Sequence, residues 1–330
     1  MIQRLILHIG RHKTGTSAIQ LYLAAHRAAF AAEGIAIPST GGFRDAAADP
    51  ADKVAHHRIA EDFGLARAGD KARRQGWLAE IEAASQGAET IVLSSELFQN
   101  ANDFLGLREL AAGRHVEVVC YLREYLDYAL SAWAQEVKKT GLAAGFFEFE
   151  RGFNPQIARF CRAWQLFANR CHWRLYDPGA DVVADFLSVT GLPDPGGRQQ
   201  AAGAQRTNPR LGGSLLGFKL LANGAGLHSL ALAQALEPLA AARQAWRRPL
   251  RLAPDRQAAL RTKDYNAELE ALFGELPLRD FSDGAWPFES PDLAKDFAEI
   301  LAATAEFPAI QRHPLFRPFL ETAMLQGETT

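Results

Sequence analysis

Short β-type runs alternate with longer helical patterns through the first half of the chain. Apolar runs that suit buried strands lie at Leu5–Ile9, Ile35–Ile37, Thr90–Ser94, Val116–Tyr121 and Trp173–Tyr176. Apolar residues recur at helical spacing between them, at Thr16–Ala32, Lys71–Ser85, Tyr125–Thr140 and Pro155–Ala168. Strands that alternate with helices form a parallel sheet covered by those helices. The pattern therefore predicts an α/β fold of three layers around a central parallel sheet.

The second half of the chain lacks strand signals and is predicted to be helical. Helical patterns follow Pro178, at Val182–Thr190, Leu211–Ala222, Ser229–Arg243, Asp255–Phe273 and Pro291–Thr304. The weakly hydrophobic stretch Pro193–Gln205 is predicted to be a hinge or flexible loop. We therefore expect one domain over residues 1–330, with an α/β nucleotide-binding core at 1–178 and a mainly helical cap at 179–330.

The composition is that of an ordinary globular protein, with 330 residues, 48% hydrophobic residues, a net charge of −2 and a mean hydropathy of −0.14. The chain has no block of basic residues, which argues against a protein that binds nucleic acid or a membrane surface. No stretch approaches the roughly 18 apolar residues of a membrane span, and Arg11 comes too early for a signal peptide. We therefore expect a cytoplasmic protein whose cysteines, Cys120, Cys161 and Cys171, are reduced.

The first predicted strand runs into a loop that suits an anion. The loop reads Gly10-Arg11-His12-Lys13-Thr14-Gly15-Thr16-Ser17 and is followed by a predicted helix. Backbone N–H groups and the positive helix end converge there, while Lys13 adds a charge. Lys13 precedes Gly15, whereas a Walker A loop places its lysine directly before the hydroxyl residue. A phosphate-like oxyanion fits this loop; the alternative is a plain turn with Thr14 or Thr16 as helix cap.

This loop resembles the phosphosulfate-binding loop of sulfotransferases that use 3′-phosphoadenosine 5′-phosphosulfate (PAPS). The family pattern is Pro-Lys-Ser/Thr-Gly-Thr-Thr/Ser, and the matching residues are His12, Lys13, Thr14, Gly15, Thr16 and Ser17. His12 stands where the family has proline. The resemblance implies a P-loop-like fold, PAPS as the sulfuryl donor, and a nucleotide-binding loop made by these residues together with Arg11.

Two later segments resemble the same family. Arg123 at a predicted strand end and Ser131, eight residues further on, have the spacing of the pair that holds the nucleotide 3′-phosphate in the family. An arginine and a hydroxyl two helical turns on can close on one phosphate, to which arginine donates bidentate hydrogen bonds. Arg206, in Arg206-Thr207-Asn208-Pro209, resembles a late loop that covers the nucleotide. These matches imply that all three residues bind the nucleotide.

The residue that stacks on adenine in cytosolic members of the family has no counterpart here. Those members have tryptophan directly after the hydroxyl pair, where this chain has Ala18. Adenine stacking must then come from another aromatic side chain, for which Trp133 and Phe98 are candidates, although aromatics at such positions are more often core residues.

Two residues are candidates for the base that activates the acceptor. Glu96 follows the predicted strand Thr90–Ser94, and in several branches of the family the base comes just after this strand. A carboxylate there faces the crevice where parallel sheets bind ligands. His57, in His56-His57, is the second candidate, because an imidazole has a suitable pKa. Adjacent histidines on a helix face about 100° apart, so only one of them points easily into a site. No metal site is expected, because no further His, Cys or Asp stands at ligand spacing.

The sequence favours an enzyme that moves a sulfuryl group from PAPS to a hydroxyl acceptor, such as a saccharide or a small metabolite. In this hypothesis Lys13 neutralises charge on the leaving oxygen, and Glu96 or His57 activates the acceptor. A P-loop kinase or NTPase is an alternative, disfavoured by the position of Lys13 and by the lack of an evident Walker B aspartate. A non-catalytic nucleotide-binding module on the same fold is another.

Overall fold

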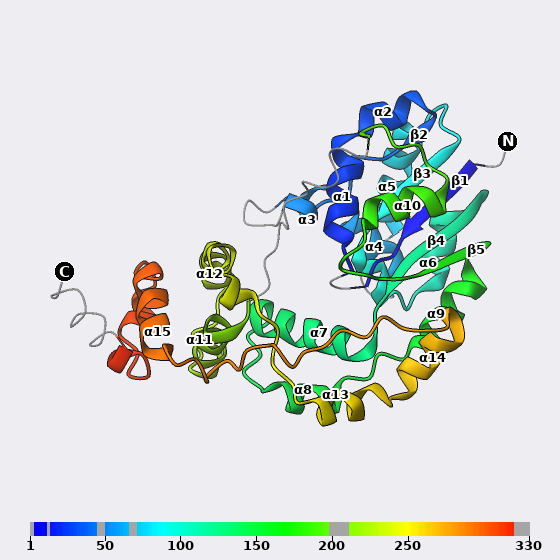
Figure 1. Cartoon of the computed structure of the whole chain (residues 1–330). Coiled ribbons are helices and arrows are strands. Elements are labelled where there is room, and N and C mark those ends of the chain that lie inside the picture. Colours follow the sequence, from blue (N-terminus) through cyan, green and yellow to red (C-terminus); the bar gives the residue numbers. More distant parts are fainter. Residues whose placement is uncertain (1–2, 12–13, 45–49, 66–70, 198–210, 320–330) are drawn as a thin grey trace. The chain divides into compact units, whose positions relative to one another are not determined.

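The computed structural model of the chain describes residues 3–11, 14–44, 50–65, 71–197 and 211–319. The chain forms two compact units, coloured along the sequence in Figure 1. The first comprises residues 1–123 and 156–207, and the second comprises residues 124–155 and 208–330. Because the chain enters the second unit twice, the two units do not follow a linear division at residue 178.

The first unit is built on a five-stranded sheet in the order β2-β3-β1-β4-β5. Its strands are β1 (Gln3–His8), β2 (Ile35–Ala36), β3 (Thr90–Ser94), β4 (Arg114–Leu122) and β5 (Arg170–Leu175). All four pairings are parallel. The last four residues of β1 and the last seven of β4 are buried without alternation, as expected of strands with both faces covered. The predicted α/β class with a central parallel sheet is confirmed.

Helices cover both faces of this sheet. On one face α1 (Thr16–Ala25), α2 (Arg27–Ala32) and α10 (Val182–Thr190) pack against side chains of the central strands, among them Ile6, Val92 and Val119. The alternate residues of the strands point to the opposite face. The remaining helices of the unit are α3 (Pro50–Val54), α4 (His57–Gly64), α5 (Lys71–Ala84), η1 (Glu96–Asn100), α6 (Phe104–Ala111) and α9 (Ile157–Phe167). The single helix predicted at Thr16–Ala32 is interrupted at His26, which separates α1 from α2.

The order of the strands creates a switch point beside β1. The chain builds β2 and β3 on one side of β1 and then crosses to β4 on the other side. In this register His8, the last residue of β1, lies opposite Ser94 of β3 and Val119 of β4. Open α/β sheets bind ligands in the crevice at the carboxyl ends of strands where the order reverses. The segments that follow β1, β3 and β4 therefore border the expected ligand crevice.

The second unit is helical. Its helices are α7 (Tyr125–Lys139), α8 (Phe146–Gly152), α11 (Gly213–Gly224), α12 (Leu230–Ala242), η3 (Gln244–Arg247), α13 (Pro254–Arg261), α14 (Asp264–Phe273), α15 (Leu293–Ala303) and α16 (Pro308–Gln311). Phe218, Phe297 and Phe316 are fully buried in its core. The prediction of a mainly helical second half is confirmed, although the helix predicted at Asp255–Phe273 is two helices separated at Thr262.

Two sequence-based expectations about side chains and membranes can be compared with the described part of the chain. Among the described residues, none of Cys120, Cys161 and Cys171 is part of a disulfide, as predicted. Among the helices that the structure describes, none has the length and apolar character needed to cross a bilayer. Most of the predicted flexible stretch Pro193–Gln205 lies outside the described residues.

Candidate functional site

The turn between β1 and α1 presents an uncapped helix N-terminus. Gly15 is the N-cap residue of α1 and has φ 77°, a conformation that favours glycine. No side chain caps this helix in the described part of the chain. The hydroxyl of Thr14 instead donates a hydrogen bond to the carbonyl of Arg11, at 2.5 Å. The expected alternative, a turn capped by Thr14 or Thr16, is therefore wrong. The backbone N–H groups of Thr16 and Ser17 are candidates to bind a ligand, whereas the N–H of Ala18 donates to the carbonyl of Gly15 at 3.0 Å.

Two buried polar side-chain atoms near Gly10 have no hydrogen-bond partner among the described residues. They are Oγ1 of Thr16, whose residue is 5% exposed, and Nε2 of His8, whose residue is 0% exposed. A Cβ at Gly10 would lie 2.2 Å from the first atom and 3.2 Å from the second. Burial lowers the pKa of His8 to about 3, so its imidazole is uncharged at neutral pH. Glycine at position 10 thus leaves room beside an unpaired hydroxyl at the start of α1.

The structure describes only some of the predicted ligand-binding residues of this loop. Arg11 is 8% exposed, and its guanidinium lies 4.7 Å from the ring centroid of Phe160. Ser17 is half-buried in the first turn of α1. His12 and Lys13, two predicted ligand-binding residues, lie outside the described residues, and so does Arg206.

Arg123 and the loop at Gly15 both lie next to the same side chain, Tyr176. The Arg123 side chain leaves the end of β4 and is 4% exposed, with its guanidinium 5.0 Å from the ring centroid of Tyr176. A Cβ at Gly15 would lie 3.3 Å from Cε2 of the same ring. The Tyr176 ring therefore borders both the uncapped turn and the guanidinium. Ser131 belongs to the second unit, where it is buried in α7, so its pairing with Arg123 stays a prediction.

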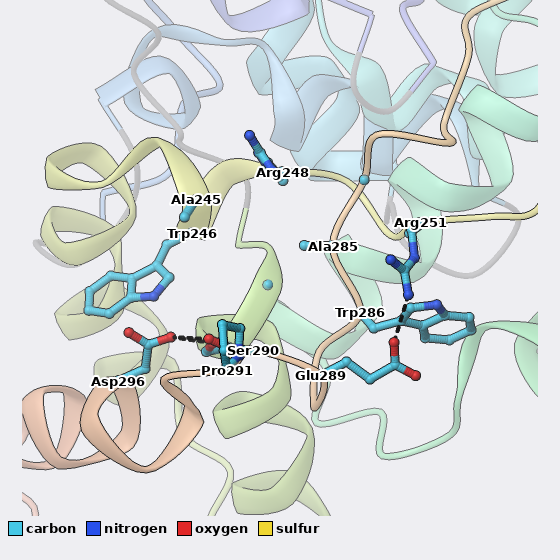
Figure 2. Close-up of a pocket in the computed structure, with 13 residues that line it drawn as sticks. Ala245, Trp246, Arg248, Arg251, Ala285, Trp286, Glu289, Ser290, Pro291 and Asp296 are labelled. Carbon is cyan, nitrogen blue, oxygen red and sulfur yellow. Dashed lines mark hydrogen bonds and ion pairs between the residues drawn. The ribbon is translucent and has the colours of Figure 1, made fainter.

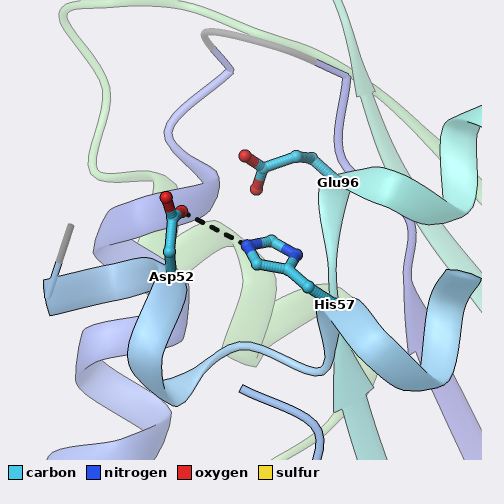
Figure 3. Close-up of side chains that lie close together, drawn as sticks. All are labelled: Asp52, His57 and Glu96. Carbon is cyan, nitrogen blue, oxygen red and sulfur yellow. Dashed lines mark hydrogen bonds and ion pairs between the residues drawn. The ribbon is translucent and has the colours of Figure 1, made fainter. Parts of the chain in front are cut away.

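The two candidate bases meet each other and a third residue, Asp52, in the first unit. Glu96 begins η1 directly after β3, His57 begins α4, and Asp52 lies on the short helix α3. Figure 3 shows the three side chains facing a common space, and one ligand atom from each lies within 4.8 Å of the others. The expectation that no metal-ligand cluster exists rested on spacing along the chain, and the fold removes that reason by bringing these residues together.

The hydrogen bonds of His57 engage both of its nitrogens. Nδ1 lies 2.8 Å from Oγ of Ser95, and Nε2 lies 3.2 Å from Oδ1 of Asp52. With Asp52 ionised, a neutral imidazole donates its Nε2 proton to the carboxylate and accepts the Ser95 hydroxyl proton at Nδ1. Glu96 is half-buried, and its Oε2 accepts a hydrogen bond from Nε2 of Gln20 at 3.3 Å.

The neighbouring histidine has a different role. His56 is 2% exposed, its Nδ1 accepts the backbone N–H of Ser94 at 3.0 Å, and its Nε2 donates to the carbonyl of Pro38 at 2.9 Å. Burial lowers its pKa to about 4. His56, the N-cap residue outside α4, is therefore a neutral structural residue, and only His57 of the pair faces the acidic side chains.

The two aromatic residues considered for adenine stacking lie in the core, as aromatics at such positions more often do, and the structure adds a residue that the sequence did not identify. Trp133 is 2% exposed and donates Nε1–H to the carbonyl of Ala144, and Phe98 is 0% exposed. Both rings belong to the core, so neither presents a face for adenine. Tyr176, at the end of β5, is half-buried beside Arg123. An aromatic residue at the end of the predicted strand Trp173–Tyr176 was the available signal for it.

A cavity of about 260 Å³ lies in the second unit, around the start of α11. Two of its charged side chains have partners within the lining: Arg251 forms an ion pair with Glu289 at 2.7 Å (Figure 2), and Asp296 accepts a hydrogen bond from Ser214 at 2.5 Å. The side chains in these two pairs therefore already have polar partners. The unpaired hydroxyl and the converging acidic side chains make the first unit the better candidate for chemistry.

Comparison with known proteins gives one structural similarity. No protein-family model and no curated protein matches the chain. The crystal structure of a sulfotransferase from Alicyclobacillus acidocaldarius is similar to it over 71% of this chain and 100% of that one, with 16% sequence identity and a TM-score of 0.37.

The two threonines of the loop provide a test of whether the Thr16 hydroxyl is kept for a ligand. A buried hydroxyl without a partner costs about 1–3 kcal/mol, whereas an ordinary hydrogen bond contributes about 1 kcal/mol. We predict that Thr16→Val leaves the free energy of unfolding unchanged or raises it by about 1 kcal/mol in urea titrations without ligand. Thr14→Val, the matched control, should lower it by about 1 kcal/mol or more. Equal destabilisation by the two substitutions would show that the Thr16 hydroxyl stabilises the fold itself.

Proposed function

We propose that this protein is a sulfotransferase that moves the sulfuryl group of PAPS to a hydroxyl acceptor. The observation that carries the proposal is the buried hydroxyl of Thr16, which has no hydrogen-bond partner among the described residues and lies at the uncapped start of α1, beside the space left by Gly10. An oxyanion of the donor would accept this hydroxyl proton together with the N–H groups of the first helical turn. The motif of this loop agrees with that of PAPS-dependent enzymes.

Charge stabilisation is the main task in such a transfer. Sulfuryl transfer resembles phosphoryl transfer in being an in-line displacement, in which positioning and electrostatics dominate. Lys13 would neutralise the negative charge that develops on the leaving oxygen of the 5′-phosphate. The acceptor oxygen forms a bond to sulfur as the bond from sulfur to the leaving oxygen breaks, and the nucleotide product is adenosine 3′,5′-bisphosphate (PAP). We expect turnover to need no divalent metal, because a sulfuryl group is less highly charged than a phosphoryl group.

The 3′-phosphate would bind at Arg123. The guanidinium is held over the Tyr176 ring and is only 4% exposed, which fixes its orientation and removes it from bulk water. A partly desolvated arginine donates strong, bidentate hydrogen bonds to a phosphate. Ser131 and Arg206 remain the proposed additional contacts to this phosphate.

Glu96 is the better of the two candidate bases. Both nitrogens of His57 are engaged by Ser95 and Asp52, so His57 must give up one of these hydrogen bonds before it can accept a proton from the acceptor. Among the described residues, the carboxylate of Glu96 accepts one hydrogen bond, at 3.3 Å, and it is half-buried, which leaves it able to accept a proton. His57 would then act as a positioning residue in the same site. The acceptor is proposed to be a saccharide or another small hydroxyl compound.

The alternative reaction, phosphoryl transfer from ATP, fits the site less well. A P-loop kinase or NTPase holds Mg²⁺ with an aspartate at the end of a neighbouring strand. Here β3 ends in Ser94 followed by Ser95, and β4 ends in Leu122 followed by Arg123. An arginine in that position favours a further phosphate on the nucleotide over a metal ion.

Nucleotide binding tests the proposal without knowledge of the acceptor. We predict that PAP raises the melting temperature much more than AMP, ADP or ATP with Mg²⁺. A ligand at 100 times its dissociation constant stabilises the folded state by about 2.7 kcal/mol, which a thermal shift detects. Arg123→Ala should remove most of this preference for the 3′-phosphate, because loss of one partner of a desolvated charge pair costs about 2–5 kcal/mol.

The readout is the difference between the shifts caused by PAP and ADP, so that a lower melting temperature of the Arg123→Ala variant itself does not matter. Arg170→Ala removes an exposed arginine of the same unit and is the matched control. Equal shifts with PAP and ADP in the unmodified protein would contradict the proposal, and so would an unchanged preference in Arg123→Ala.

The assignment of the base is tested by two substitutions that preserve shape. We predict that Glu96→Gln lowers the rate of transfer by about 10²–10⁴, the usual contribution of a positioned base, and leaves the affinity for PAP unchanged. His57→Gln should have a smaller effect on the rate. The reverse order of the two effects, measured in single-turnover assays, would transfer the role of base to His57.

A further inference from the structure

We propose that Asp52, His57 and Glu96 also form a binding site for a divalent transition-metal ion such as Zn²⁺. The three residues come from α3, from the start of α4 and from the segment after β3, and each offers one ligand atom within 4.8 Å of the others. Two carboxylates and an imidazole are a donor set that binds such ions. This site lies in the first unit and does not depend on sulfuryl transfer.

The spacing between the first two ligands already suits an ion. Nε2 of His57 lies 3.2 Å from Oδ1 of Asp52. Two ligands that each lie about 2.0–2.2 Å from Zn²⁺ are separated by about 3.3 Å at a tetrahedral angle. The ion would therefore take the place of the Nε2 proton with little movement of either side chain, and the imidazole stays neutral because Nδ1 takes up a proton from solvent as Nε2 gives one up. Glu96, which is half-buried, would close on the ion by rotation of its side chain.

A buried amide at the edge of this cluster provides the second, independent observation. Gln20 is 2% exposed, and its Nε2 donates to Oε2 of Glu96 at a long 3.3 Å. Its Oε1 has no hydrogen-bond partner in the part of the chain that the structure describes. The two ends of a carboxamide interchange by a rotation of 180°. With an ion beside Glu96, that rotation would turn the unpartnered oxygen of Gln20 into a fourth ligand.

Ser95 orients the imidazole of His57 through its other nitrogen, Nδ1. Its Oγ lies 2.8 Å from Nδ1 of His57 and also accepts the backbone N–H of Leu97 at 3.1 Å. A metal-bound imidazole needs an acceptor for its other N–H, which fixes the ring in place. The second lone pair of the hydroxyl can accept that proton. The change of tautomer that metal binding requires is thus accommodated without movement of the ring.

A second cluster in the same unit shows why not every such group is a metal site. Glu117 lies 2.8 Å from Nε2 of His172 and 4.0 Å from Nε2 of His115. Its carboxylate, however, is already bound by two nitrogens of Arg4, at 2.6 and 2.8 Å, and these interactions hold its pKa down to about 2. The guanidinium occupies the position that a cation would take. This cluster therefore serves as an internal control.

Ion selectivity and the effect on activity follow from the donor set. An imidazole ligand favours Zn²⁺ over Mg²⁺ and Ca²⁺, which prefer oxygen donors alone. A bound ion would take the carboxylate of Glu96 away from an acceptor hydroxyl. Zn²⁺ is thus expected to inhibit any transfer in which Glu96 is the base.

The test is calorimetric titration of the metal-free protein with Zn²⁺ or Mg²⁺, without nucleotide or acceptor. We predict one Zn²⁺ site per chain and no comparable site for Mg²⁺. Asp52→Asn and His57→Gln should each weaken Zn²⁺ binding at least tenfold, and Ser95→Ala should weaken it by about 10–100-fold. His115→Gln, in the control cluster, should leave the affinity unchanged.

Equal affinity for Zn²⁺ in Asp52→Asn and the unmodified protein would overturn the proposal. Loss of binding in His115→Gln would also overturn it, because the ion would then bind at the control cluster. Circular dichroism of the Asp52→Asn and His57→Gln variants separates loss of the site from loss of the fold. Failure of PAP to bind, with the Zn²⁺ results as predicted, would contradict the proposed sulfuryl transfer and leave the metal site standing.

Discussion

The parallel pairing of β1 with β3 on one side and β4 on the other is the constraint on which the candidate site depends. Parallel strands end at the same edge of a sheet, and the register sets His8 opposite Ser94 and Val119. The segments beyond these strands contribute the uncapped turn, Glu96 and Arg123. Residues far apart in the sequence therefore reach one crevice because of strand order alone.

Two buried, uncharged histidines, His8 and His56, form hydrogen bonds to the end of β3 at this edge of the sheet. Nδ1 of His8 lies 2.8 Å from Oγ of Ser94, and the backbone N–H of Ser94 donates to His56. Burial lowers the pKa of both histidines, to about 3 and about 4, so that neither carries a charge at neutral pH. The end of β3 is thereby tied to β1 and to the start of α4, which presents His57 next to Glu96. The charged side chains of the candidate site therefore lie next to buried polar side chains that carry no charge.

Much of this arrangement could be predicted from local sequence signals. Apolar runs predicted the five strands, and the glycines after the first strand predicted a tight turn into a helix, because these signals are short-range; the binding of an anion by this turn stays a prediction. Asp52 could not be assigned in this way, since α3 has only 5 residues and its contact with His57 depends on how two short helices meet. The aromatic candidates failed for a related reason: composition does not reveal that Trp133 and Phe98 are enclosed by the core.

The loop after β1 is proposed to bind and activate a sulfuryl donor, and Lys13 is the residue on which that activation is proposed to depend. The most direct measurement is transfer of ³⁵S from labelled PAPS to water or to a panel of hydroxyl compounds, with PAP release followed in parallel, for the unmodified protein and for Lys13→Ala. We predict PAP release and labelled product from the unmodified protein, at least about 10²-fold slower transfer by Lys13→Ala, and equal melting temperatures without ligand. Lys13→Ala that transfers at the unmodified rate, or a protein that hydrolyses ATP with Mg²⁺ and leaves PAPS intact, would contradict this account.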